Sequence, residues 1–131
     1  MFRLDKRKIF LLYQYYLLGK VGKSEEKTVK EQERVIWLAN CLKKENFLRA
    51  KISKNLKENW TFDRLPPLEK ALLIFATQEL FFGSNPNYGK VIIDQTINFS
   101  KVYLEEGKYR YINKNLDLLW QDWLKTKRMN Y

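Results

Sequence analysis

Four cations stand close together near the start of the chain. Lys6, Arg7 and Lys8 are consecutive, and Arg3 precedes them by about one helical turn. Cations at this density neutralise phosphate groups, and Tyr13, which follows them, could stack on an unpaired base. The spacing therefore favours a surface for single-stranded RNA. The alternative that these residues leave open is a solvated helix end that only keeps the protein soluble, with its tyrosines anchored in the core.

A single acidic residue, Glu79, interrupts the apolar stretch of residues 71–80. Because a lone buried carboxylate is costly, we expect Glu79 to be paired, hydrogen-bonded or placed at a protein–protein surface. The alternative is a partly exposed carboxylate at a helix end. Asp94 and Asp117 lie in later helices, and nothing in their spacing from Glu79 specifies an acid–base pair.

Several kinds of chemistry are excluded by composition. Histidine is absent and Cys41 is the single cysteine. The usual zinc and iron–sulfur ligand sets, a Cys–His or Ser–His–Asp nucleophile and an intramolecular disulfide therefore cannot be assembled. The sequence also has no glycine-rich phosphate loop and no EF-hand loop. We expect a protein that is not an enzyme and that has no cofactor and no metal.

The charge balance indicates a polyanionic partner. The 131 residues are enough for one domain and include 25 Lys and Arg against 15 Asp and Glu, a net charge of +10. Such an excess favours nucleic acid first and an anionic membrane surface second. Residues 1–60 hold 15 basic and 7 acidic residues, whereas residues 61–131 hold 10 and 8. The basic surface therefore belongs to the first half.

The N-terminal region imitates a signal peptide, because its basic cluster precedes the apolar residues 9–18. Gln14 and several tyrosines dilute that run, and no segment reaches the roughly 18–20 apolar residues of a spanning helix. We expect a soluble cytoplasmic protein that does not enter a membrane.

Glycine and proline mark the joints between long helical intervals. They cluster at Gly19 and Gly22, at Pro66 and Pro67, between Gly83 and Gly89, and at Gly107. The spacing of apolar residues predicts helices over residues 5–18, from residue 28, over 47–59, from the two prolines to residue 81, over 88–104 and after residue 107. The result is an all-α domain of six to seven helices.

The helix faces can be predicted from the same spacing. The second helix begins with a capping box, Thr28-Val29-Lys30-Glu31, and its apolar face holds Val35, Leu38, Ala39 and Leu42. The third buries Leu48, Ile52 and Leu56. A second basic group is interpreted as a solvated flank: Lys43, Lys44, Arg49, Lys51, Lys54 and Lys57. The fourth helix is apolar almost all round and should form the centre of the core.

Several segments resemble the NusB family of bacterial transcription antitermination factors. Residues 60–80, from Trp-Thr-Phe-Asp-Arg-Leu-Pro-Pro to Gln-Glu-Leu, are similar to that family's leucine-rich central helix. Residues 90–97 (KVIIDQTI) resemble its Lys-Val-Ala-Ile-Asn-Glu-Ala segment, residues 111–117 (YINKNLD) its Phe-Val-Asn-Gly-Val-Leu-Asp segment, and residues 12–15 (LYQY) its Leu-Tyr-Gln segment. The order and spacing agree over about half the chain.

The resemblance implies a fold of two packed three-helix halves, about residues 1–60 and 61–131. It implies antitermination of ribosomal RNA transcription, with boxA-type RNA bound together with the ribosomal protein NusE inside the transcription elongation complex. We expect a monomer or weak homodimer. The predicted RNA-binding residues are Arg3, Lys6, Arg7, Lys8, Tyr13, Lys114 and Asp117, and the predicted partner-binding residues are Gln78 and Glu79.

This chain also departs from the family pattern. The Asn-Gly pair is Asn113-Lys114, the tyrosine before Glu79 is Gln78, and the frequent arginine of the central helix is Ile74. These differences leave an alternative open, a protein-interaction module of the same fold that has lost specific RNA recognition. A fragment of an RNA-modifying enzyme is disfavoured, because such enzymes need a cofactor-binding domain that 131 residues cannot supply.

Overall fold

The described part of the chain is built of helices, as predicted. The computed structural model describes residues 2–19, 28–83 and 86–129, and for 86 and 127–129 the backbone alone. Within these ranges lie α1 (Lys6–Leu18), α2 (Val29–Lys43), α3 (Glu45–Ser53), η1 (Phe62–Arg64), α4 (Pro67–Phe82), η2 (Pro86–Tyr88), α5 (Gly89–Tyr103) and α6 (Lys108–Met129). The all-α prediction of six to seven helices is confirmed. No helix in these ranges is sufficiently long and apolar to span a bilayer.

The helix ends follow from local chemistry. Asp5 caps α1 by accepting the backbone N–H of Arg7, and Gly19 ends it at φ 74°, a left-handed conformation that suits glycine. The predicted capping box of Thr28 and Glu31 is present at the start of α2. Pro67 is the first residue of α4, where a missing N–H costs nothing. The predicted break at Gly22 lies outside the described residues.

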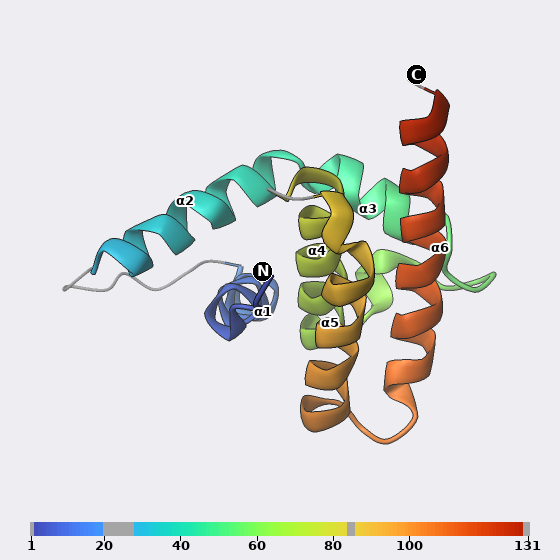
Figure 1. The fold of residues 1–131 in the computed structure, drawn as a ribbon. Coiled ribbons are helices and arrows are strands. Elements are labelled where there is room, and N and C mark those ends of the chain that lie inside the picture. The colour runs from blue at the N-terminus through green and yellow to red at the C-terminus, as the bar shows by residue number, and fades with distance from the viewer. Residues whose placement is uncertain (1, 20–27, 84–85, 130–131) are drawn as a thin grey trace.

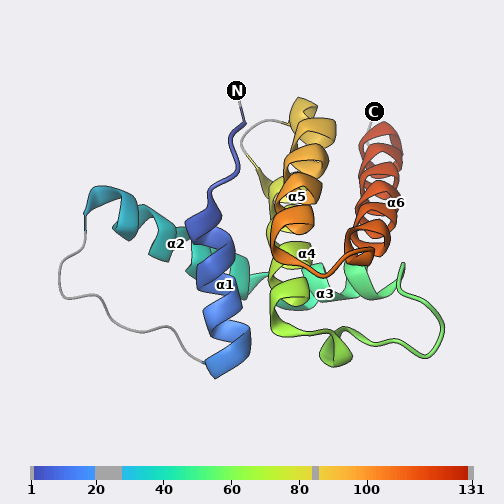
Figure 2. The same ribbon diagram turned by 90° about the horizontal axis from the view of Figure 1, so that it is seen from below.

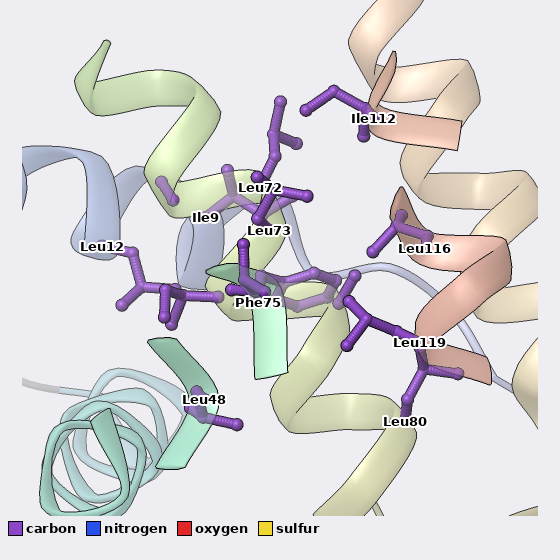
Figure 3. Close-up of a cluster of buried hydrophobic side chains, with 14 of the residues drawn as sticks. Ile9, Leu12, Leu48, Leu72, Leu73, Phe75, Leu80, Ile112, Leu116 and Leu119 are labelled. Carbon is purple, nitrogen blue, oxygen red and sulfur yellow. The ribbon is translucent and has the colours of Figure 1, made fainter. Parts of the chain in front are cut away.

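Helix α4 is the centre of the core. From Ala71 to Gln78 every residue of α4 is buried, and the helix contacts α1, α3, α5 and α6. Figure 3 shows side chains of α1, α3 and α6 converging on Phe75 and the leucines of α4. A helix that is apolar on all sides is stable in water only when neighbours cover each side. The prediction of α4 as the core helix is therefore confirmed.

The other helices take fixed sides around α4. Figures 1 and 2 both show α1 and α6 on opposite sides of the α4–α5 pair, with α3 crossing one end. Among the described residues, three α-helices precede residue 60 and three follow it. The boundary between two halves at about residue 60 stays a prediction, because α4 contacts helices on both sides of it.

Two predictions about the basic first half are wrong. Val35 and Ala39 are exposed, and the buried residues of α2 are Leu38 and Cys41. The inner face is rotated because Trp37 turns inward and packs against Phe75 of α4, with ring centroids 5.8 Å apart. Leu42 is half-buried beside it.

The third helix is shorter than predicted and its flank is less solvated. α3 ends at Ser53, and residues 54–60 form turns in which Asn59 has a left-handed backbone. Leu56 still packs against the core from these turns. Two cations of the flank are committed to ion pairs: Lys51 donates to Asp122 of α6 at 2.9 Å, and Arg49 pairs with Glu45 and Asp63.

The packing of α5 against α6 gives the first testable prediction. Gly89 is buried at the start of α5, and a Cβ added there would collide with the indole ring of Trp120. We expect Gly89→Ala to lower the free energy of unfolding by about 1–3 kcal/mol, as overpacking does. Chemical denaturation measures this change.

The double variant Gly89→Ala/Trp120→Leu is the control, because it removes the ring that the new methyl group meets. The cost of Gly89→Ala should be smaller in the Trp120→Leu background. An increase in stability on Gly89→Ala alone, as expected from helix propensity without a collision, would contradict this packing.

Candidate functional site

Three cations gather at the N-terminal end of α1 with no compensating acidic residue in the first turn. Lys6 and Arg7 are the first two residues of the helix, Arg3 lies just before it, and all three are exposed. Among the described residues none of them has a carboxylate within 4 Å. The N-terminus of a helix is already positive, so cations there destabilise the helix and attract anions.

The chain that carries these cations is fixed to two other helices. Gln95 of α5 accepts the backbone N–H of Leu4 at 2.7 Å and donates to the carbonyl of Phe2 at 3.0 Å. Arg34 of α2 donates to Asp5 at 2.8 Å. These bonds place Arg3 between two anchored residues. The cationic end of α1 is therefore a held surface and not a loose tail.

Lys8 has a different environment from its two neighbours. Its ammonium lies 3.7 Å from a carboxylate oxygen of Glu79 on α4 and 4.9 Å from the ring centre of Trp37 on α2. The structure thus brings together a residue predicted to bind RNA and one predicted to bind a protein partner. The remaining cations of the cluster, Arg3, Lys6 and Arg7, form the part that is open to solvent.

Glu79 is a shared acceptor at the last turn of α4. In addition to Lys8, the indole N–H of Trp37 donates to its Oε1 at 2.9 Å, and the Glu79 side chain is 12% exposed. The expectation that this carboxylate is paired and hydrogen-bonded is confirmed. Glu79 also lines a cleft beside α1, α2 and α4.

That cleft has a volume of about 290 Å³ and polar walls. Its lining residues are Lys8, Trp37, Asn40, Lys44, Gln78, Glu79, Phe82 and Gly83. Gln78 is 5% exposed, and its buried Oε1 has no hydrogen-bond partner among the described residues. A buried amide oxygen without a donor is unfavourable, so this wall has an unmet demand for an N–H or O–H group.

The other predicted site residues lie elsewhere. Lys114 and Asp117 are exposed on α6, and α5 lies between α6 and α1. Partial burial, followed by the charge of Asp94 on α5, raises the pKa of Asp117. Tyr13 is half-buried and packs against the core. These three residues are not brought to the cationic end of α1.

Sequence reasoning missed the residues that organise the site. Trp37 joins Lys8 to Glu79, and Gln95 fixes the chain around Arg3. Trp37 bonds Glu79 from forty-two positions away, and Gln95 bonds residues more than ninety positions away, so no local spacing could have indicated them. Over the part of the chain that the structure describes, no three side chains of the metal-binding types are grouped to hold an ion.

Comparisons with known proteins agree with one another. The family model described as "NusB family" matches residues 12–118. The protein named "Transcription antitermination protein NusB" from Helicobacter pylori (strain Shi470) is 34% identical over 98 residues, which cover 72% of this chain and 69% of the relative. The protein of the same name from Helicobacter acinonychis (strain Sheeba) gives the same values. The protein of that name from Lactococcus lactis subsp. lactis (strain IL1403) is 33% identical over 72 residues, 55% of this chain and 36% of the relative. No solved structure matches the chain.

Cys41, a buried cysteine of α2, gives a prediction of how stability depends on pH. Burial, then the charges of Glu79 and Glu45, raises the pKa of this thiol from 9.0 to about 12. The folded state therefore keeps the neutral thiol, whereas the unfolded chain ionises above pH 9. The stability that the neutral thiol contributes is complete below pH 9 and is lost as the pH rises towards 12. At pH 10 the loss should be about 1 kcal/mol.

Urea unfolding at pH 8 and pH 10 measures this loss, with Cys41→Ala as the matched control. The variant should lose less stability than the wild type between the two pH values, because tyrosine and lysine titrations are common to both. Equal losses in the two proteins would refute the assignment.

Proposed function

The chain belongs to the NusB family, and from that premise we propose that it is a non-enzymatic RNA-binding adaptor of transcription antitermination. In this role it binds boxA-type RNA through the N-terminal end of α1 and the ribosomal protein NusE through the cleft at Glu79. The assembly acts within the transcription elongation complex and favours read-through of ribosomal RNA genes.

The observation that carries the RNA proposal is the placement of Lys6 and Arg7 in the first turn of a helix with no acidic residue there. The helix alone would be more stable with acidic residues at these positions. A phosphate group gains from the two cations and from Arg3 at once, whereas the helix end itself is already capped by the carboxylate of Asp5. Single-stranded RNA supplies consecutive phosphates at a spacing that such a surface can follow.

The cleft supports the partner proposal through its unmet hydrogen bonding. Gln78 offers a buried acceptor, and Glu79 offers a carboxylate that is already oriented by Trp37. A protein segment with basic donors would pair with the carboxylate of Glu79. Lys8 belongs to this surface as the partner of Glu79, although its place beside Arg7 keeps it within reach of the RNA surface.

Lys114, Asp117 and Tyr13 remain part of the proposal as residues that the family resemblance suggests. An RNA that contacts both α1 and α6 must cross α5, which carries Asp94 and Gln95.

The alternative function is a protein-interaction module in which the cations of α1 serve solubility. The two functions predict different effects of removing Lys6 and Arg7: the first predicts weaker RNA binding, and the alternative predicts unchanged RNA binding.

The RNA proposal predicts a defined salt dependence. With three phosphate contacts, from Arg3, Lys6 and Arg7, log affinity for a short boxA-type RNA should fall with log salt at a slope of about −2. The double variant Lys6→Ala/Arg7→Ala should bind roughly ten-fold or more weakly, with the slope reduced to about −0.7. Fluorescence anisotropy across a salt series measures both quantities.

The matched control is Lys30→Ala/Lys43→Ala, which removes two exposed cations of α2 and changes the net charge equally. It should bind RNA nearly as the wild type does. Equal weakening by both double variants would mean that net charge, and not the end of α1, attracts RNA. Wild-type binding by Lys6→Ala/Arg7→Ala would favour the protein-interaction module. The melting temperature of Lys6→Ala/Arg7→Ala should equal or exceed that of the wild type, because the end of α1 loses unfavourable cations.

The partner proposal predicts that Glu79→Lys abolishes binding of purified NusE in the absence of RNA. The substitution removes the acceptor of Trp37 and places two cations together, so it should also lower the free energy of unfolding by about 1–3 kcal/mol. Calorimetric titration measures the binding, and chemical denaturation measures the stability.

The charge-swapped double variant Lys8→Glu/Glu79→Lys separates these effects. It restores an ion pair between the same two positions, so part of the stability should return while NusE binding stays lost. Recovery of NusE binding together with stability would show that Glu79 acts only inside the fold. Unchanged binding in Glu79→Lys would place the partner on another surface.

A further inference from the structure

A second cleft lies at the opposite end of α4 from Glu79, beside the turns that join α3 to α4. It has a volume of about 250 Å³ and walls that are largely apolar. The turns of residues 54–66 provide one wall, the first turn of α4 the floor, and the first turn of α6 the other wall. Since α6 and α1 lie on opposite sides of α4, this cleft is remote from the cationic end of α1 (Figures 1 and 2).

The floor of this cleft holds a carboxylate with few donors. Glu69 is 4% exposed and accepts the hydroxyl of Tyr111. Among the described residues it makes no ion pair and no second side-chain hydrogen bond. A carboxylate has about four acceptor positions. The carboxylate of Glu69, which lines the cleft, therefore has acceptor positions left for the N–H groups of a ligand.

The rim of the cleft has an aromatic platform. Trp60 is 51% exposed although it borders an apolar cavity. The backbone holds it in place: its N–H donates to the carbonyl of Lys57 at 2.9 Å, Asn59 before it has φ 76°, and Arg64 donates to the carbonyl of Asn59 at 3.3 Å. The half-exposed indole ring at this rim offers a face for stacking a planar group.

Positive charge surrounds the same cleft. Lys57, Arg64 and Lys108 line it from three different segments, against the single negative charge of Glu69. The N-termini of α4 and α6 also meet here, because Pro66 and Glu69 belong to one and Lys108 to the other. Helix N-termini add to the positive potential. The cleft therefore combines an acceptor, a stacking surface and sites for an anion.

We propose that this cleft binds a guanine nucleotide, with the base stacked on Trp60, its Watson–Crick edge donating to Glu69, and its phosphate held by Lys57, Arg64 and Lys108. Guanine presents two adjacent donors, N1–H and N2–H, and a carboxylate accepts both. Adenine has an acceptor at N1, and uracil has one donor, so neither matches a carboxylate as well. A volume of about 250 Å³, below that of pockets for drug-sized ligands, suits a single base.

The test is calorimetric titration of the full chain with 5′-GMP, 5′-AMP and guanosine at low salt. GMP should bind roughly ten- to a hundred-fold more tightly than AMP, the range of discrimination of a bidentate contact. Guanosine should bind more weakly than GMP and without salt dependence, because it lacks the phosphate. A short single-stranded RNA with one guanine, compared with the same RNA with adenine instead, distinguishes an RNA base from a free nucleotide by whether it displaces GMP.

Three variants assign the contacts. Glu69→Gln keeps an acceptor for Tyr111 but introduces an NH₂ group against the donors of guanine, so GMP affinity should fall ten-fold or more. AMP affinity should not fall, because the amide offers an acceptor for N6–H and a donor for N1 of adenine. Trp60→Ala should weaken GMP and AMP alike. Lys57→Ala/Lys108→Ala should weaken GMP binding and leave guanosine binding unaffected, whereas the control Lys43→Ala/Lys90→Ala, at two exposed lysines that do not line the cleft, should bind GMP normally.

Equal affinity for GMP and AMP, wild-type GMP affinity in Glu69→Gln, or no GMP binding at millimolar concentration would each overturn the proposal. The variant Lys6→Ala/Arg7→Ala should bind GMP as the wild type does. Failure of this site and failure of the RNA surface on α1 are therefore distinguishable.

Discussion

The burial of α4 on all sides is the constraint on which the rest of the structure depends. Its middle residues are apolar and completely covered, so charged groups on this helix can lie only at its two ends. Glu69 in the first turn and Glu79 in the last turn occupy these positions. Each accepts a hydrogen bond from an aromatic side chain, Tyr111 or Trp37, and each borders a cleft with cations at its edge. The core thus determines where recognition can occur.

Covering α4 also fixes α1, and with it the cationic end of that helix. Ile9 and Leu12 are completely buried against the core, which leaves the first turn at the edge of the packed region. Burying these two residues stabilises the helix by several kcal/mol in total, enough to outweigh the unfavourable charges at its start. A helix supported only by its own propensity could not carry Lys6 and Arg7 at this position. Tertiary packing therefore permits a helix end that is suited to anions.

Much of this fold could be predicted from local sequence, and the exceptions have a common cause. The positions of glycine and proline predicted the order of the helices. Thr28 and Glu31 predicted the start of α2, and the unbroken apolar run predicted that α4 forms the core. The prediction of the inner face of α2 was wrong because Trp37 turns towards Glu79, which is forty-two positions away in the sequence. The expectation that Glu79 is paired was correct, but its partners, like the donor to Glu69, are distant in sequence. Periodicity describes one helix at a time and holds no information on such contacts.

The net charge of +10 is a poor guide to where an anion binds. Many cations of the first half are already committed: Arg34 to Asp5, Arg49 to Glu45 and Asp63, and Lys51 to Asp122. An ion pair lowers the potential that a distant phosphate experiences, and salt screens what remains within about 8–10 Å. The position of a cation therefore matters more for anion binding than the number of cations. A cation at a helix N-terminus adds to a field that is already positive, whereas one beside a carboxylate is largely cancelled. For this reason three residues at the end of α1 carry the RNA proposal, although the first sixty residues contain 15 cations.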